Sequence, residues 1–169
     1  VIFCPEDLQL IKGTPSGRRR FLDMEISQTS ATYYHQLMQY NRLLQQRNAV
    51  LKEYRGKNTI PLEEWDLQLA DMASFIVKKR LESLKKINLL IDLMNRKLTG
   101  GLENLTIGYE QPYMDNGSLE YTKEGFYERI KAALPQDRHR LSTSVGPHRD
   151  DLRFFSDAMD LKKFGSQGQ

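Results

Sequence analysis

Two long stretches of the chain carry apolar residues at helical spacing. In the first, steps of four and three alternate along Tyr33, Leu37, Tyr40, Leu44, Arg47, Leu51 and Tyr54. In the second, a helix predicted over about 62–98, similar steps connect Leu84, Ile87, Ile91, Met94 and Leu98. Each set lies on one side of a helix, and Arg47 is the single polar member of the first set. Gly56 and Pro61 separate the two stretches, which predicts an antiparallel helical hairpin with Leu84, Ile87 and Ile91 facing the first helix.

Shorter patterns predict the remaining elements. The chain opens with an apolar strand at 1–4, followed by a helix that starts at Pro5 and closes at Lys12 and Gly13. A further helix begins after Thr14, its candidate N-cap. Beyond Gly101, the sequence predicts a strand with Leu105, Ile107 and Tyr109 on one side, a "DNGS" turn, a helix that ends near Pro135, and two strands over 151–164 with a turn at 156–158. The predicted fold class is α+β, mostly α: a long antiparallel helical hairpin with a few short strands.

Composition narrows the class of protein. The chain has 169 residues, of which 28% are charged and 39% hydrophobic, which is typical of one globular domain with its own core. It has no apolar run of about 18 residues, so no membrane span is expected. Its single cysteine, Cys4, excludes an internal disulfide framework and fits a reducing cytoplasm. Because it begins at Val1 and ends abruptly in a glycine-rich stretch, we expect it to be a piece of a longer protein.

Positive charge is concentrated in the segment 78–97. This segment contains seven basic and two acidic residues, so its net charge is +5, compared with +3 for the whole chain. The candidates for contact with DNA are Lys78, Lys79, Lys85 and Lys86. No aromatic residues are interleaved for base stacking, which favours duplex backbone over single strands. The alternative is an ordinary amphipathic surface.

A run of arginines forms a second candidate site. Arg18, Arg19 and Arg20 follow one another on a predicted helix and therefore point in three directions. They either contact phosphate, since arginine can give it two parallel hydrogen bonds, or form a solvated face with one ion pair from Arg19 or Arg20 to Asp23.

The segment "GPHRDDL" holds a third group of polar residues: His148, Arg149, Asp150 and Asp151. Adjacent aspartates in an extended segment point to opposite faces, which suits a metal poorly. We therefore expect a structural turn with an arginine–aspartate pair. The sequence predicts no metal site and no catalytic residue, and without GxxxxGK[ST] the chain cannot hydrolyse a nucleotide alone.

Four long strings together resemble the RecF family of bacterial recombination mediators. They are "FCPEDLQLIKGTPSGRRRFLDMEIS", "YNRLLQQRNAVLK", "GPHRDDL" and "FGSQGQ". The family belongs to the ABC-type ATPases related to SMC proteins, with an ATPase head and a mostly helical lobe. The resemblance implies that 1–13 is a connecting strand and helix from the head, 14–134 the helical lobe, and 135–169 the return strands. The Walker A and Walker B motifs would lie outside this chain.

The resemblance also gives a role to the last residues. "GSQGQ" is similar to the start of the ABC signature motif, so Ser166, with Gln167 and Gly168, would hold the γ-phosphate of ATP bound by the other subunit. Backbone N–H groups before a helix suit an anion. ATP and Mg are the implied cofactors of the full-length protein, a slow DNA-dependent ATPase. This fragment is expected to bind no cofactor and to be no enzyme.

The family's partners complete the expectation. The resemblance implies a cytoplasmic, ATP-dependent homodimer that binds double-stranded DNA, works with RecO and RecR, and helps load RecA at gapped DNA in DNA repair, recombination, replication and the SOS response. The resemblance gives no role to His148, Arg149, Asp150 and Asp151, and our hypothesis is that this segment braces the lobe against the signature face. The alternatives are a structural spacer, or an adaptor lobe that docks another protein and has no DNA contact.

Overall fold

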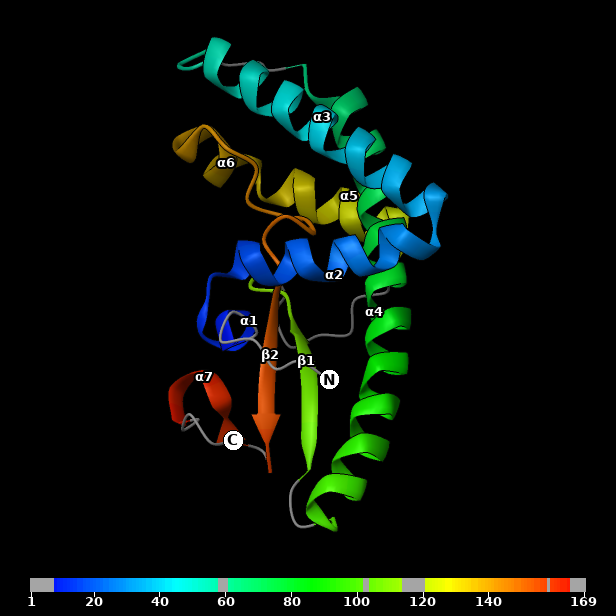
Figure 1. Cartoon of the computed structure of the whole chain (residues 1–169). Coiled ribbons are helices and arrows are strands. Elements are labelled where there is room, and N and C mark those ends of the chain that lie inside the picture. The colour runs from blue at the N-terminus through cyan, green and yellow to red at the C-terminus, as the bar shows by residue number, and fades with distance from the viewer. Residues whose placement is uncertain (1–7, 58–60, 102–103, 114–120, 158, 165–169) are drawn as a thin grey trace. The chain divides into compact units, whose positions relative to one another are not determined.

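The computed structural model is mostly helical, with one small sheet (Figure 1). It describes residues 8–57, 61–101, 104–113, 121–157 and 159–164. In chain order the elements are α1 (Leu8–Lys12), α2 (Pro15–Thr29), α3 (Ala31–Glu53), α4 (Glu63–Thr99), β1 (Leu105–Glu110), α5 (Lys123–Ala132), α6 (Leu134–Arg140), β2 (Asp151–Ser156), β3 (Met159–Asp160) and α7 (Leu161–Phe164). The predicted α+β, mostly α class is confirmed.

The chain forms two compact units. Unit 1 comprises Val1–Glu25, Arg80–Glu110 and Asp150–Gln169, and it contains the sheet. Unit 2 comprises Ile26–Lys79 and Gln111–Arg149. The division into connector, lobe and return strands given above concerns the attachment to a head and stays a prediction.

Local capping explains where several helices begin. The hydroxyl of Thr14 accepts a hydrogen bond from the Gly17 N–H at 3.2 Å, so the predicted N-cap of α2 is confirmed. Ser30 caps α3 in the same way through the Tyr33 N–H, at 3.2 Å. Because an N-cap leaves the helical backbone, Ser30 separates α2 from α3.

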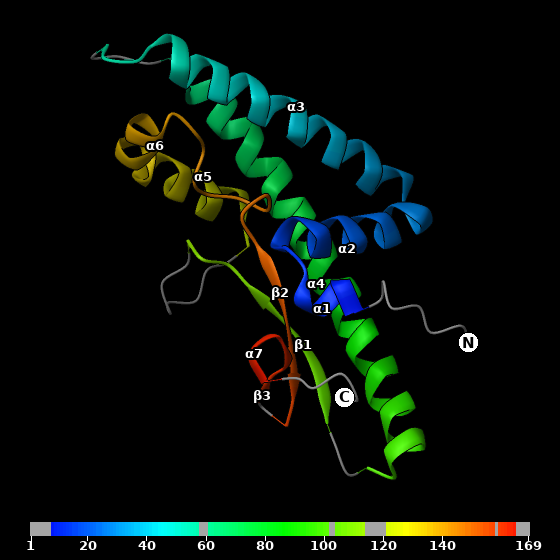
Figure 2. The ribbon, with the colours of Figure 1, turned by 60° about the vertical axis from the view of Figure 1, so that its left-hand side comes forward.

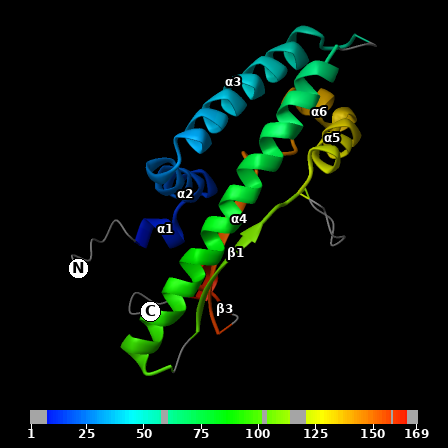
Figure 3. The same cartoon turned by 90° about the vertical axis from the view of Figure 1, so that its right-hand side faces the viewer.

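The hairpin of unit 2 follows the predicted stripe. Figures 2 and 3 show α3 folding back along the first part of α4. The fully buried members of the α3 stripe are Tyr33, Tyr40, Arg47 and Leu51. On α4, the buried apolar residues of this unit are Leu69, Ala70, Ala73, Ile76 and Val77. Burial of these side chains is the main stabilising contribution to the pair.

The later half of α4 belongs to unit 1, whereas α3 belongs to unit 2. The Asn88 amide donates to the Ile107 carbonyl at 2.9 Å and accepts the Ile107 N–H at 2.8 Å. Met94 and Leu98, the last members of the apolar set on this helix, are 63% and 84% exposed.

The sheet is three-stranded in the order β1-β2-β3. β1 and β2 are antiparallel, with Leu105 opposite Ser156 and Glu110 opposite Asp151. The predicted tight turn lies at Asp157, which has φ +47°. β3 has only two residues, because the Asp160 carboxylate accepts the Lys162 N–H at 2.9 Å where α7 begins. The predicted last strand is therefore mostly helix.

The remaining predictions concern the strand at 1–4, the "DNGS" turn and the helix that ends near Pro135. The strand at 1–4 and the "DNGS" turn lie outside the described residues. The helix predicted before Pro135 is α5, which ends at Ala132. A further helix, α6, follows with Pro135 in its first turn, where proline's missing N–H is tolerated.

Candidate functional site

Arg18 lies inside unit 1. It is 1% exposed, and its Nε and Nη2 each donate to one Asp151 carboxylate oxygen at 2.7 Å. Its Nη1 donates to the carbonyls of Ile11 and Gly13, at 3.2 and 2.8 Å. All three nitrogens are therefore used within the unit, which corrects the prediction that Arg18 contacts DNA.

The neighbouring arginines differ from Arg18 and from each other. Arg19 is half-buried, and its Nη1 donates to the Asp150 carbonyl at 2.6 Å. Burial, together with the nearby Arg80 charge, lowers the Arg19 pKa. Arg20 is exposed. Of the three, Arg20 has the exposure that a phosphate contact requires.

Asp23 pairs with Arg80 rather than with Arg19 or Arg20. The Arg80 Nε and Nη2 each donate to one Asp23 carboxylate oxygen at 2.9 Å. Arg80 is 2% exposed, and its Nη1 lies 3.8 Å from the Asp150 carboxylate. The predicted local pair is wrong, because the fold supplies a buried two-pronged partner 57 residues away. Arg80 therefore adds little to the positive surface of 78–97.

Tyr109 joins the same group of charges. Its hydroxyl donates to the Asp150 carboxylate and receives a hydrogen bond from the Arg80 Nη1 at 3.2 Å. Burial raises the Tyr109 pKa well above its ordinary value; Arg80 opposes this and the Asp150 charge adds to it. Tyr109 thus stays a protonated donor at neutral pH.

The "GPHRDDL" segment is a structural turn, as the sequence suggested, but its aspartates pair with Arg18 and Arg80 rather than with Arg149. Arg149 is exposed, and its Nε and Nη2 donate to the Thr143 carbonyl at 3.1 and 2.8 Å. Within the described ranges, no group of three or more His, Cys, Asp or Glu side chains could hold a metal ion.

His148 completes this turn inside unit 2. Its Nε2 lies 3.0 Å from the Thr143 carbonyl, and its Nδ1 lies 2.6 Å from the Tyr40 hydroxyl. Because a carbonyl can only accept, Nε2 carries the proton, and Nδ1 accepts from Tyr40 in the neutral ring. Both ring nitrogens thus bind the unit's own atoms, as a positioning role requires.

Unit 2 contains a second buried ion-pair network, centred on Arg47. The Arg47 Nε donates to Asp66 at 2.6 Å, and Nη1 donates to Asp137 at 2.7 Å and to Thr143 at 2.9 Å. Arg47 and Asp137 are both 0% exposed. Burial raises the Asp66 pKa, although its bond to Arg47 acts in the opposite direction. We did not predict this network; its one signal was a lone arginine in an apolar stripe.

The predicted DNA-contacting lysines lie at the surface of α4. Lys78, Lys85 and Lys86 are exposed and Lys79 is half-buried. Lys78 and Lys79 belong to unit 2, and Lys85 and Lys86 to unit 1. Each unit therefore offers its own pair of candidates.

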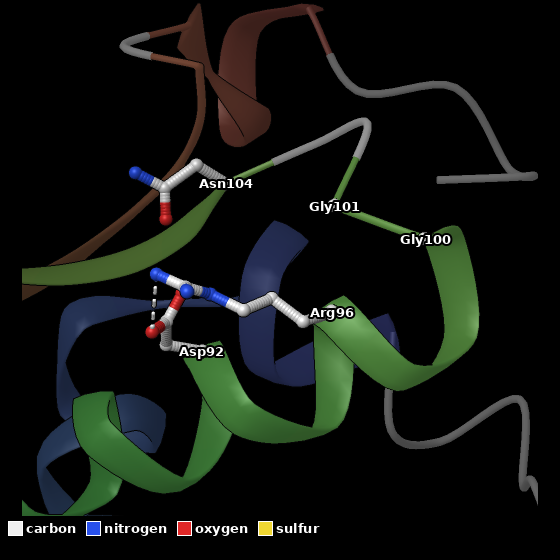
Figure 4. A pocket seen from close by; sticks show the side chains of 5 residues that line it. All are labelled: Asp92, Arg96, Gly100, Gly101 and Asn104. Carbon is white, nitrogen blue, oxygen red and sulfur yellow. Dashed lines mark hydrogen bonds and ion pairs between the residues drawn. The ribbon is translucent and has the colours of Figure 1, made fainter.

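A shallow hollow lies between the end of α4 and β1 in unit 1 (Figure 4). It has a volume of about 440 Å³ and is lined by Asp92, Arg96, Gly100, Gly101 and Asn104. The Arg96 Nε donates to Asp92 at 3.1 Å, one helical turn away. Because this exposed pair satisfies its own charges, the hollow presents no catalytic constellation.

The remaining predicted site residues, Ser166, Gln167 and Gly168, lie outside the described residues. Over the part that the structure describes, we find no helix with the length and apolar character needed to cross a membrane.

The chain is similar in sequence to known proteins. No family model matches the chain. It is 44% identical to the DNA replication and repair protein RecF of Alkaliphilus oremlandii, over 100% of this chain and 47% of that protein. The proteins of the same name from Clostridium botulinum strain Eklund 17B and Bacillus cytotoxicus are 44% and 41% identical, again over all of this chain and 46% of theirs. The chain thus spans about half the length of these curated relatives.

Solved structures of RecF are also similar to this chain. A structure of the recombination mediator protein RecF with ATPrS in the RecFOR pathway matches with a TM-score of 0.90 and 34% identity. A corresponding RecF–ATP structure matches with a TM-score of 0.88 and 35% identity. Each match covers 100% of this chain and 46% of the solved chain.

Proposed function

Because this chain belongs to the RecF family, we propose that it is the helical-lobe part of a DNA recombination and repair mediator. The observation that carries the proposal is the match to RecF along the whole chain, at 44% identity in sequence and a TM-score of 0.90 in structure. The full-length protein would bind ATP with Mg, form an ATP-dependent homodimer in the cytoplasm and hydrolyse ATP slowly when bound to DNA. It would act with RecO and RecR to load RecA at gapped DNA, including during the SOS response.

The lobe's own contribution in this proposal is a surface for duplex DNA. Its candidates are the exposed Lys78, Lys85 and Lys86, the half-buried Lys79, and Arg20. Arg18 is left out because its guanidinium is buried against Asp151, and Arg19 because it binds the Asp150 carbonyl. Flexible, exposed lysines neutralise phosphates without reading sequence, so this contact would be non-specific and sensitive to salt.

Binding of a labelled DNA duplex across a salt series tests this role. Each neutralised phosphate contributes a slope of roughly 0.9 in log affinity against log salt. We expect the double variants K78E/K79E and K85E/K86E each to lower the slope by about one to two units. K123E/K131E is the matched control, since Lys123 and Lys131 are exposed on α5. Equal losses in all three variants would mean a general charge effect.

A structural or adaptor lobe is the second candidate function. The buried networks around Arg18, Arg47 and Arg80 favour it, because they position the backbone without any ligand. No DNA binding even at low salt, with retained binding to RecR, would support this alternative.

We also propose that Ser166, Gln167 and Gly168 contact ATP across the dimer, and that His148 to Asp151 brace the lobe against that signature face. Arg149 is the exposed side chain of this segment. In the full-length protein, Arg149→Ala should weaken ATP-dependent dimerisation, measured by light scattering with and without ATP. Unchanged dimerisation would exclude the bracing role.

A further inference from the structure

One side of the later half of α4 presents large apolar residues to solvent in unit 1. Two rows spaced by four residues run along it: Leu89, Leu93 and Lys97 in one, and Lys86, Leu90, Met94 and Leu98 in the other. Residues four apart are neighbours on a helix surface, so the rows form one continuous strip. We call its five apolar members, Leu89, Leu90, Leu93, Met94 and Leu98, the α4 apolar face.

The exposure of this face is unusual for a soluble protein. Its five side chains are 59% to 84% exposed. Single exposed apolar residues are ordinary, whereas a contiguous strip of large ones marks a surface that another surface covers.

The unit's own core does not account for the face. The opposite side of the same helix turns is already buried: Leu84 is 4% exposed and Asn95 is 7% exposed. Asn88 is held there by its two hydrogen bonds to the Ile107 backbone. Since a helix can turn only one side to its sheet, the α4 apolar face requires a different occupant.

We propose that, in the longer RecF polypeptide, the half of the chain outside the matched segment packs on the α4 apolar face. Solved RecF chains match all of this chain with only 46% of their own length, at TM-scores of 0.90 and 0.88. Their remaining polypeptide joins the matched part at one or both ends, and α1 and α7, the first and last described elements, both belong to unit 1. The additional chain therefore connects to the unit that carries the face. This inference rests on the family membership and not on DNA binding.

The charges along the strip define the chemistry of the covering surface. Lys97 is exposed at one end of the first row and Lys86 at the start of the second. An isologous contact with a second copy would set these like charges near one another in a desolvated strip. The covering surface is therefore apolar at its centre, with carboxylates opposite Lys97 and Lys86.

Cysteine labelling under native conditions tests the proposal. All variants carry Cys4→Ser, and Leu93→Cys places a single thiol in the α4 apolar face. The rate of maleimide labelling is measured in the 169-residue chain and in the full-length RecF polypeptide that carries it, at the same low protein concentration. Met38→Cys is the matched control, because Met38 is 52% exposed and Leu93 59%.

We expect L93C to label about ten-fold or more slowly in the full-length polypeptide than in the 169-residue chain, since a covered site reacts only through local opening. M38C should label at similar rates in both. Adding Lys97→Glu to full-length L93C should restore part of the labelling rate, because it opposes the facing carboxylates. M94C provides a second thiol in the same face should L93C perturb the fold, as judged by circular dichroism.

Three results would overturn the proposal. Equal labelling of L93C in both chains would mean that the face is exposed in RecF. Protection that disappears on dilution would assign the face to a second copy, and protection that appears only with an added protein would assign it to a separate partner. DNA binding is measured independently, so its failure would leave this result unchanged.

Discussion

Removing the guanidinium of Arg47 is the sharpest test of what holds unit 2 together. Arg47→Met keeps a long apolar stem in the stripe of α3 and deletes the charge. The substitution leaves the carboxylates of Asp66 and Asp137, which are 5% and 0% exposed, without the cation that they share. The Thr143 hydroxyl also loses its donor.

The expected loss follows from this burial. Breaking a buried pair by removing one partner costs about 3–5 kcal/mol, because the remaining charge stays desolvated. A typical domain is stable by roughly 5–15 kcal/mol, so the variant should lose about a fifth or more of its free energy of unfolding. Arg47→Lys should also destabilise, since an ammonium cannot bridge Asp66 and Asp137 with the planar fork of arginine.

Urea unfolding followed by tryptophan fluorescence is the assay. Trp65 is the only tryptophan of the chain, and it lies in unit 2 next to Asp66. Arg42→Met is the matched control, because Arg42 is exposed on the same helix. We expect R42M to change the free energy of unfolding by less than about 0.5 kcal/mol.

The dependence on pH provides an independent check. Burial raises the Asp66 pKa even with Arg47 present, and loss of Arg47 should raise it further. A raised folded-state pKa stabilises the fold below it, so the R47M deficit should shrink as pH falls toward the ordinary aspartate value of 3.8. A loss below about 1 kcal/mol at neutral pH, the range of surface pairs, would refute the reasoning.

Two further predictions concern Asp151 in unit 1 and Gly146 in unit 2. Burial alone would raise the Asp151 pKa, but the bonds from Arg18 and the Leu152 N–H outweigh it, so the pKa lies below 3.8. Asp151→Asn should therefore reduce stability most at neutral pH, and its urea midpoint should approach that of the unmodified chain as the pH falls below 3.8; a constant gap would contradict this. Gly146 has φ +131°, and a Cβ there would overlap the Tyr40 hydroxyl, so Gly146→Ala should cost about 2 kcal/mol or more in urea unfolding. Gly56→Ala, at φ +79° in open space, should cost about 1 kcal/mol, and equal losses would argue against the overlap.

The sequence was most informative where structure depends on near neighbours. The steps of four and three predicted α3 and the later half of α4, the break at Gly56 and Pro61 predicted where α4 begins, and Thr14 predicted the start of α2. These features depend on residues within about one helical turn. The boundary between β3 and α7 was missed because the Asp160 side chain ends the strand by capping the next turn.

Long-range pairing was not predictable in the same way. Arg47 stood out by position, but its partner Asp137 is 90 residues away. Arg18 and Asp151 are separated by 133 residues, and a single sequence contains nothing that selects this pair over a local one. The sequence thus indicated that arginines and aspartates would pair, and only the fold determined which ones.

The hydrogen bonds of Asn88 have a consequence for aggregation. Among the strands that the structure describes, β1 lies at an edge of the sheet, and an edge strand with free N–H and C=O groups is a template for a strand of another molecule. The Asn88 amide occupies the donor and the acceptor of Ile107 on that edge, so an incoming strand would have to displace both bonds. At the opposite edge, β3 offers only two residues, too short for stable strand addition. A side-chain amide thus protects the β1 edge of the described sheet from intermolecular pairing.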